Sequence, residues 1–357
     1  MRRQIIIGFI IIVLLGIGIV IGLLLWDDES KQDSTTDQTN SNITSATEEA
    51  IINLTDLTTT SESFIFENGS ATITKGGSYY VTGTTTGQIV VDAKDEEIVL
   101  FLNNISIRSQ NGPAILAKEA KTLTLYLVDG SDNQVSDYKT SEYDAAIYSK
   151  CDLELDGTGK LTVVGNIEEG IATDGKKITI NGGIYDITSK DDGINTGGVG
   201  DRITINDGVL YINAKGDGID SNRDLIINGG TLFVSATGAN DNSGLDADGS
   251  YTINGGTIVA LGMGMLENPN ANSQQTTITI QLPQTISANT LVSLLNDQEQ
   301  EIISWQGDNS YKTIVVSTPD ITNASYRLYK NGSHSGSLAY GIYVDGNYTK
   351  GDLVRSN

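Results

Sequence analysis

The sequence contains little cysteine, histidine or proline, and each shortage excludes a class of protein. Cys151 is the only cysteine among 357 residues, so disulfide bonds cannot hold this chain together. With His334 as the only histidine, the chain also lacks the four Cys and His ligands of a structural zinc site. Basic residues are few as well, because 22 Lys and Arg stand against 45 Asp and Glu, a formal net charge of −23. Such an acidic chain repels phosphates, which excludes nucleic acid as a partner.

Glycine is abundant, at 40 residues against 4 prolines, which is typical of an all-β protein with many turns. Its positions repeat: Gly170, Gly193, Gly218 and Gly244 recur at intervals of 23, 25 and 26 residues, and each is followed by Ile or Leu. A strand and an Asn-Gly-Gly-like turn follow each of these anchor glycines. A period of this length in Val-, Ile- and Thr-rich sequence predicts a solenoid whose stacked coils share one core.

Earlier anchors at Gly87, Ala114 and Ala146 extend the series to seven predicted coils between about residues 87 and 268. Alternating apolar residues indicate strands that point one face inward and pair in parallel with the coils above and below. Two core columns follow from the alignment of the coils. The first contains Ile180, Ile205, Ile227 and Ile253, and the second contains Ile187, Ile212, Val234 and Ala260. We therefore predict a parallel β-helix over residues 63–268.

The turns align in the same way. A stacked asparagine can hydrogen-bond to its equivalent one coil away, so the repeated turn asparagines are interpreted as a structural ladder rather than as a binding site. The members of this ladder are Asn181, Asn206, Asn228 and Asn254.

The ends of the chain have a different character. Residues 5–26 are uncharged and long enough to cross a bilayer, and the flanking charges place residues 1–4 in the cytoplasm and the rest outside the cell. No cleavage signal ends this run, so we expect a retained single-pass anchor. Residues 27–62 are polar and are expected to form a disordered linker. Residues 269–357 break the period and are expected to form a small β-region that caps the last coil, with short strands at 276–282, 291–295, 313–317 and 326–329.

Acidic residues recur at fixed offsets from the anchor glycines. The position before the anchor, and those two and four residues after it, would stack their oxygens along one edge of the solenoid. A column of carboxylates is unfavourable without a cation, and calcium prefers six to eight oxygen ligands, so the pattern favours a calcium site. Turn preference alone explains any one of these residues, but not their concentration in the last four coils. The predicted ligands are Asp191, Asp192, Asn195, Asp217, Asp220, Asn222, Asp246 and Asp248.

Several stretches, in order along the chain, resemble a family of bacterial surface proteins with a carbohydrate-binding domain. They include 73–83 (ITKGGSYYVTG), 191–195 (DDGIN), 216–222 (GDGIDSN) and 326–329 (YRLY), and the resemblance covers roughly residues 62–350. It implies a right-handed, pectate-lyase-like β-helix that contains calcium and binds plant cell-wall polysaccharides such as polygalacturonate and cellulose. By the family's pattern, the aspartates of the predicted ligand set would hold the calcium.

Three functions remain open from the sequence. In a binding module, calcium would bridge protein and uronate carboxylates, while exposed Tyr211 and Phe233 would stack on sugar faces. In a calcium-dependent lyase, Lys190 or Lys215 would abstract the proton next to the uronate carboxylate, although surrounding carboxylates make either lysine a poor base. In a structural surface protein, calcium would only add rigidity. Of these three hypotheses, the sequence favours the binding module.

Overall fold

The described part of the chain is built from β-strands alone. Within it no helix is long and apolar enough to cross a membrane. The predicted anchor at residues 5–26 and the tail at residues 1–4 lie outside the described residues. The computed structural model describes residues 49–60, 64–198, 201–238 and 241–357.

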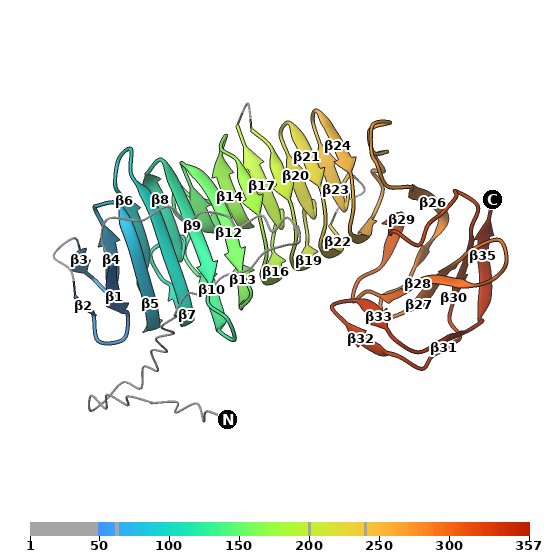
Figure 1. Cartoon of the computed structure of the whole chain (residues 1–357), viewed down its shortest axis with the longest axis horizontal. Helices are drawn as coiled ribbons and strands as arrows, with labels where there is room; N and C mark the ends of the chain where they lie inside the picture. Colours follow the sequence, from blue (N-terminus) through green and yellow to red (C-terminus); the bar gives the residue numbers. More distant parts are fainter. Residues whose placement is uncertain (1–48, 61–63, 199–200, 239–240) are drawn as a thin grey trace, which may run out of the picture. The chain divides into compact units, whose positions relative to one another are not determined.

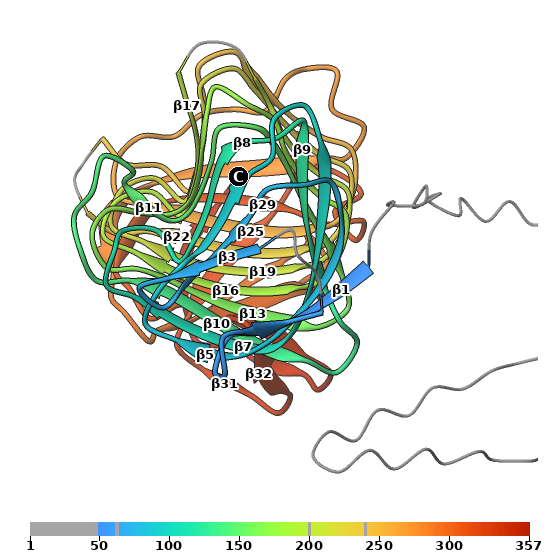
Figure 2. The ribbon, with the colours of Figure 1, turned by 90° about the vertical axis from the view of Figure 1, so that its left-hand side faces the viewer.

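Each turn of the solenoid contributes one strand to each of three faces, and Figure 1 shows the turns following one another from β5 (Gly77–Thr85) to β24 (Ser250–Ile253). Viewed along the stack, the strands of successive coils lie over one another around a common interior (Figure 2). The pairing within each face is parallel. The predicted parallel β-helix is therefore confirmed.

The first face joins strands that precede the Asn-Gly-Gly turns, and the second face joins strands that follow them. The long strands β5 and β7 (Glu97–Ser109) belong to both faces, because the two halves of each pair with different neighbours. The first face continues through β9 (Thr122–Leu127), β12 (Asp152–Gly157), β15 (Ile178–Ile180), β18 (Ile203–Ile205), β21 (Asp224–Ile227) and β24. The second face continues through β10 (Asp132–Asp137), β13 (Lys160–Gly165), β16 (Ile184–Ser189), β19 (Val209–Ala214), β22 (Thr231–Ala236) and β25 (Thr257–Gly262).

The third face contains the anchor positions and stacks eight parallel strands, one from each coil. Seven coils were expected, and the additional one begins at Ser70, ahead of the first predicted anchor. Its strand pairs Ala71 with Ile89 in the same register as the later coils. The eight strands are β4 (Ser70–Ile73), β6 (Ile89–Asp92), β8 (Ile115–Glu119), β11 (Ala145–Ser149), β14 (Glu169–Asp174), β17 (Ile194–Gly197), β20 (Ile219–Ser221) and β23 (Leu245–Ala247). A further strand, β3 (Phe64–Glu67), pairs with β4 as an antiparallel hairpin.

The predicted core columns are present. Ile180 pairs with Ile205, Ile205 with Ile227 and Ile227 with Ile253, and all four side chains are fully buried. The second predicted column is equally in register on the second face. Burial of one branched apolar side chain per strand and coil supplies the hydrophobic free energy that holds the stack together.

The predicted linker extends too far toward the coils. Residues of β1 (Glu49–Asn53) pair in parallel with β5, and β2 (Thr58–Thr59) pairs antiparallel with β1. Ile52 and Leu54 are almost fully buried against the first coil. The boundary was missed because this strand has too few residues to show a clear alternation.

The C-terminal region pairs directly with the solenoid. Its strand β29 (Tyr311–Ser317) lies between β25 and β26 (Thr277–Ile286) and is antiparallel to both. The predicted strands at 276–282, 291–295, 313–317 and 326–329 are present, while six further strands were not expected. Besides β26 and β29, the strands of this region are β27 (Leu291–Leu295), β28 (Glu301–Gln306), β30 (Arg327–Lys330), β31 (Ser333–His334), β32 (Ser337–Ala339), β33 (Ile342–Val344), β34 (Tyr348–Thr349) and β35 (Asp352–Ser356).

Candidate functional site

The third face presents a column of polar side chains between its buried positions. Parallel pairing places Asn195 of β17 beside Asp220 of β20, and Asp220 beside Asp246 of β23. Strands paired in this way lie about 4.8 Å apart, so side chains in register on adjacent coils are direct neighbours. We call this edge, with Asp192, Asp217 and Asp248, the acidic corner.

Asp192 and Asp217, one residue before the anchor glycine, tie each coil to the next. Asp192 Oδ1 accepts a hydrogen bond from the backbone N–H of Asp217 at 2.6 Å, and Asp217 Oδ1 accepts one from the N–H of Ser243 at 2.5 Å. Asn195 Nδ2 donates to Asp192 Oδ2 at 2.8 Å. The position before the anchor and the position two residues after it therefore meet in one polar cluster.

Without a bound cation, the crowded carboxylates of the acidic corner are electrostatically unfavourable. Burial, reinforced by the charges of neighbouring aspartates, raises the pKa of Asp217 and the pKa of Asp220 to about 7. Burial also raises the pKa of Asp192 and the pKa of Asp246 above the usual range. Both burial and like charge disfavour the ionised carboxylate, whereas a bound cation would favour it.

Other predicted ligands lie at the margin of this cluster. Asp191 and Asp248 are exposed, and their charges contribute to the raised pKa of Asp217 and of Asp220, respectively. Asn222 Nδ2 donates to the carbonyl oxygen of Gly198 at 3.0 Å, so its amide group supports the preceding coil. The predicted ligands are thus brought to one edge, but at different depths.

Two features show that the acidic corner suits an ion with oxygen ligands. Asn195 Oδ1 is buried and has no hydrogen-bond partner, although buried polar oxygens are normally satisfied. Gly216 lies beside the cluster, and a Cβ on it would overlap Oδ1 of both Asp191 and Asp192. A glycine here leaves room for these oxygens. The available donors are carboxylate and amide oxygens, which are the ligands that hard cations prefer.

Glu267 extends the acidic corner beyond the last coil and was not predicted. Its carboxyl group shares a hydrogen bond with Asp246, and its Oε2 accepts the N–H of Ala247 at 3.3 Å. Glu267 also lines a pocket of about 450 Å³. Glu267 was missed because it follows the end of the repeat, where the period places no residue. The pocket is lined by residues 247–251, 266–268 and 270.

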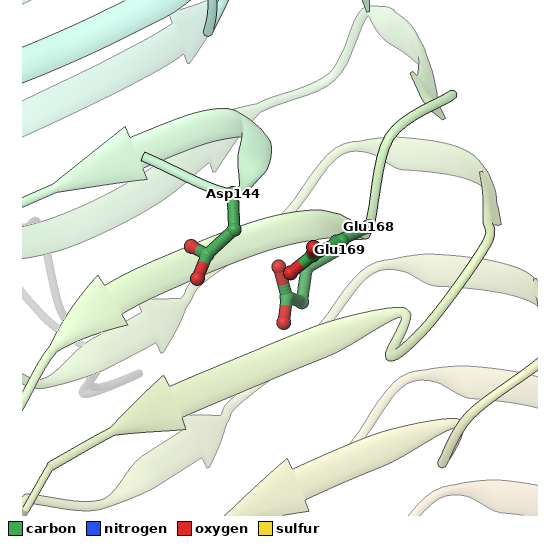
Figure 3. Close-up of side chains that lie close together, drawn as sticks. All are labelled: Asp144, Glu168 and Glu169. Carbon is green, nitrogen blue, oxygen red and sulfur yellow. The ribbon is translucent and has the colours of Figure 1, made fainter. Parts of the chain in front are cut away.

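A separate group of acidic residues lies nearer the middle of the third face. Asp144, Glu168 and Glu169 each place one carboxylate oxygen within 4.8 Å of the other two, and Figure 3 shows the three side chains close together. Within the described residues, no three aspartates of the predicted ligand set are this close together. Asp144 was missed, although it stands two residues before the anchor Ala146, as Glu168 stands before Gly170.

A sequence model of the carbohydrate-binding domain-containing protein family matches residues 67–327, which is most of the chain. The chain belongs to this family. A carbohydrate-binding domain-containing protein of Acetivibrio thermocellus is 37% identical over 121 residues, which cover 31% of this chain and 42% of that relative. The match therefore spans less than half of the relative's length.

Among solved structures, the fold is similar to that of a polysaccharide lyase-like protein from C. thermocellum, determined as a gadolinium derivative. The TM-score is 0.50 and the sequences are 27% identical. The similarity covers 60% of this chain and 93% of that chain. The resemblance inferred from the sequence motifs, to a carbohydrate-binding family with a lyase-like solenoid, is confirmed.

In this carbohydrate-binding family member, the aromatic pair expected to face sugar is covered. The rings of Tyr211 and Phe233 do stack, with centroids 5.6 Å apart. Phe233 is only 1% exposed, however, because Gly307 and Gly341 of the C-terminal region pack against its ring. Tyr211 donates its hydroxyl hydrogen bond to Asp308 Oδ2 at 2.8 Å. The expectation of an open aromatic face is therefore corrected: the C-terminal region occupies it.

Another aromatic row lies on the first face, where Tyr80, Phe101 and Tyr126 are in register. Tyr80 and Phe101 are stacked, with centroids 4.5 Å apart and an angle of 13° between their planes. The ring of Phe101 also contacts that of Tyr126, with centroids 5.1 Å apart and an angle of 52° between their planes, so the three rings contact one another along the stack. Stacking on a sugar requires an open ring face, so this row is best explained as a ladder that stabilises the coils.

Proposed function

We propose that this protein is an extracellular, membrane-anchored module that binds acidic plant cell-wall polysaccharide, such as polygalacturonate, through calcium and does not cleave it. Family membership and the lyase-like neighbour support a carbohydrate-binding or lyase-like role. The acidic polysaccharide, the calcium and the anchor are the specific parts of the proposal. The observation that carries it is the acidic corner, where Asp217 and Asp220 are half-buried among other carboxylates.

Within the acidic corner, the carboxylates of Asp217, Asp220 and Asp246 and the unpartnered Asn195 Oδ1 would hold calcium. Bound calcium supplies positive charge between the protein carboxylates and the uronate carboxylates of the glycan. Without it, a chain of net charge −23 repels a polyuronate.

The test is the affinity of the full chain for polygalacturonate, measured by calorimetry with calcium and with the chelator EGTA. We expect binding only with calcium. The double variant Asp217→Asn, Asp220→Asn should weaken it at least about tenfold, a change of about 1.4 kcal/mol. Asp297→Asn, Asp320→Asn, an exposed double change of the same charge in the C-terminal region, is the matched control and should have no effect. Binding that persists in EGTA, or that the double variant leaves intact, contradicts the proposal.

A calcium-dependent lyase is the second candidate, and the neighbour's description as lyase-like favours it. Both lysines considered for the base, Lys190 and Lys215, are exposed. Neither side chain lies in a buried, apolar setting of the kind that activates a lysine as a base. Ultraviolet absorbance of an unsaturated uronate product decides between the two functions: product formation that Lys215→Ala or Lys190→Ala abolishes establishes the lyase.

A calcium-rigidified structural protein would lose stability in EGTA but would bind neither polygalacturonate nor cellulose, so the same calorimetry separates it from the binding module.

The remaining parts of the proposal concern architecture. We propose that residues 5–26 cross the membrane, that the coil is right-handed, and that the C-terminal region caps the last coil.

A further inference from the structure

Asp144, Glu168 and Glu169 come from two adjacent coils and lie outside the acidic corner. Asp144 directly precedes β11, and Glu169 opens β14. The two strands pair in parallel, with Ala145 beside Glu169, and the N–H of Glu169 donates to the carbonyl oxygen of Asp144 at 2.9 Å. The backbone pairing therefore places the side chains of both coils at the same corner, independently of any interaction between the side chains.

Glu169 is an unusual residue to find in this position. Its side chain is only 8% exposed, and its Oε2 is buried without any hydrogen-bond partner. Burial, with the charge of Asp144 next in size, raises the pKa of Glu169 to about 8. No ion pair among the described residues involves any of the three carboxylates. An unsatisfied buried oxygen costs stability, and an ion is one of the partners that removes this cost.

The spacing of the oxygens fits one ion. Calcium binds oxygen at about 2.3–2.6 Å, so ligands on opposite sides of the ion lie about 4.6–5.2 Å apart. The three carboxylate oxygens lie within 4.8 Å of one another, so small rotations of the side chains are enough to bring all of them into contact with a single ion. Asp144 and Glu168 are exposed, which leaves water to complete the coordination.

We propose that Asp144, Glu168 and Glu169 form a calcium site that clamps the β11 coil to the β14 coil. Calcium is favoured over magnesium because it accepts irregular geometry and several carboxylates, whereas magnesium requires a near-ideal octahedron. The site shares no ligand with the acidic corner and does not depend on glycan binding, while the charge of Asp191, at the margin of that corner, also acts on Glu169. Its role is to stabilise the solenoid, so the two sites can fail independently.

Tyr148 provides a local reporter for this site. Burial and the charges of Asp174, Asp144 and Glu169 raise the pKa of the Tyr148 hydroxyl to about 12, which places its ring near the cluster. Terbium(III) is a luminescent substitute for calcium that a nearby tyrosine excites. We expect terbium emission from the full chain that calcium displaces and millimolar magnesium does not. Because the rings of Tyr143 and Tyr148 lie with centroids 5.1 Å apart, Tyr148→Phe should reduce this emission and Tyr143→Phe, Tyr148→Phe should remove most of it.

The decisive variant is Asp144→Asn, Glu168→Gln, which keeps the size of both side chains. In EGTA it should melt no lower than the wild type, because repulsion is reduced, which also shows that it folds. Calcium should raise its melting temperature by less than it raises that of the wild type. Its terbium emission should fall at least fivefold. Adding Tyr148→Phe should then cause no further loss.

The control for the acidic corner is Asp217→Asn, Asp220→Asn, which should keep the Tyr148-dependent emission. Conversely, Asp144→Asn, Glu168→Gln should keep calcium-dependent binding of polygalacturonate. The proposal is wrong if the Tyr148-dependent terbium titration and the calcium-induced rise in melting temperature are unchanged in Asp144→Asn, Glu168→Gln. Failure of glycan binding in every variant would overturn the proposed function and leave this site standing.

Discussion

At the scale of single residues, the recurring anchor glycine is a steric requirement. A Cβ on Gly193 would overlap the Cγ2 methyl of Ile212, and a Cβ on Gly218 would overlap Cγ1 of Val234. Ile212 and Val234 are fully buried, so neither side chain can move aside without opening the core. The glycine thus lets the third face approach the second face across the interior. The same close approach holds Asp192 and Asp217 beside the neighbouring coil.

We predict that Gly193→Ala lowers the free energy of unfolding by about 1–3 kcal/mol, the usual cost of an extra methyl in a packed core. The matched control is Gly197→Ala, since a Cβ there would lie 3.4 Å from the Thr173 carbonyl oxygen, an ordinary contact. The control should change stability by less than about 0.5 kcal/mol. Urea denaturation followed by circular dichroism measures both. Equal effects of the two substitutions would show that the anchor has no special steric role.

At the scale of the repeated element, the asparagine ladder links one turn to the next. Nδ2 of Asn206, Asn228 and Asn254 donates to Oδ1 of the asparagine one coil earlier, at 2.8 Å in each case. The interpretation of these residues as a structural ladder is confirmed. The amide of an interior member both donates and accepts, whereas the terminal members make one ladder bond each.

Asn228→Ala should therefore cost about twice as much as Asn254→Ala. A hydrogen bond contributes about 1 kcal/mol net, so we expect losses of about 2 and about 1 kcal/mol in the free energy of unfolding. Both side chains occupy equivalent turns, which makes each a control for the other. Equal losses, measured by urea denaturation, would indicate that the bonds along the ladder do not act separately.

At the scale of the whole described molecule, the C-terminal region continues the sheet and covers an apolar surface of the last coils. Antiparallel pairing of β29 with β25 satisfies the exposed edge of the second face. Asn309 Nδ2 donates to Asn213 Oδ1 at 2.7 Å, and Phe233 packs with Val259, Leu261 and the C-terminal strands in one cluster. An uncovered edge of this kind would be a site for aggregation.

Phe233→Ala should lower the free energy of unfolding by about 3–5 kcal/mol, as for other buried phenylalanines. Phe101→Ala is the control, because Phe101 has the same outward orientation on its coil but is only half-buried, and it should cost less than half as much. Limited proteolysis should also release the C-terminal region sooner from Phe233→Ala. If Phe233→Ala is no more costly than the control, this ring does not hold the C-terminal region.

The sequence by itself determined what depends on the repeat. Strand alternation is local and the period is nearly constant, so residues at equal offsets must stack, as the Ile180 column, the asparagine ladder and the Asp220–Asp246 pair do. Only the tertiary structure decided what lies outside the period. The C-terminal region covers Phe233 through contacts about 75–110 residues distant in sequence, which no alignment of coils contains.

The same reason explains the acidic sites. The repeat brought Asp217 and Asp220 to the edge where they were expected, but it could not reach Glu267 beyond the last coil. It also could not show that Asp144 and Glu169 would converge with a buried, unpartnered oxygen between them, because burial depends on how closely neighbouring turns pack. Periodicity fixes which residues are neighbours along the stack, whereas burial and the direction of each side chain are decided by the folded chain as a whole.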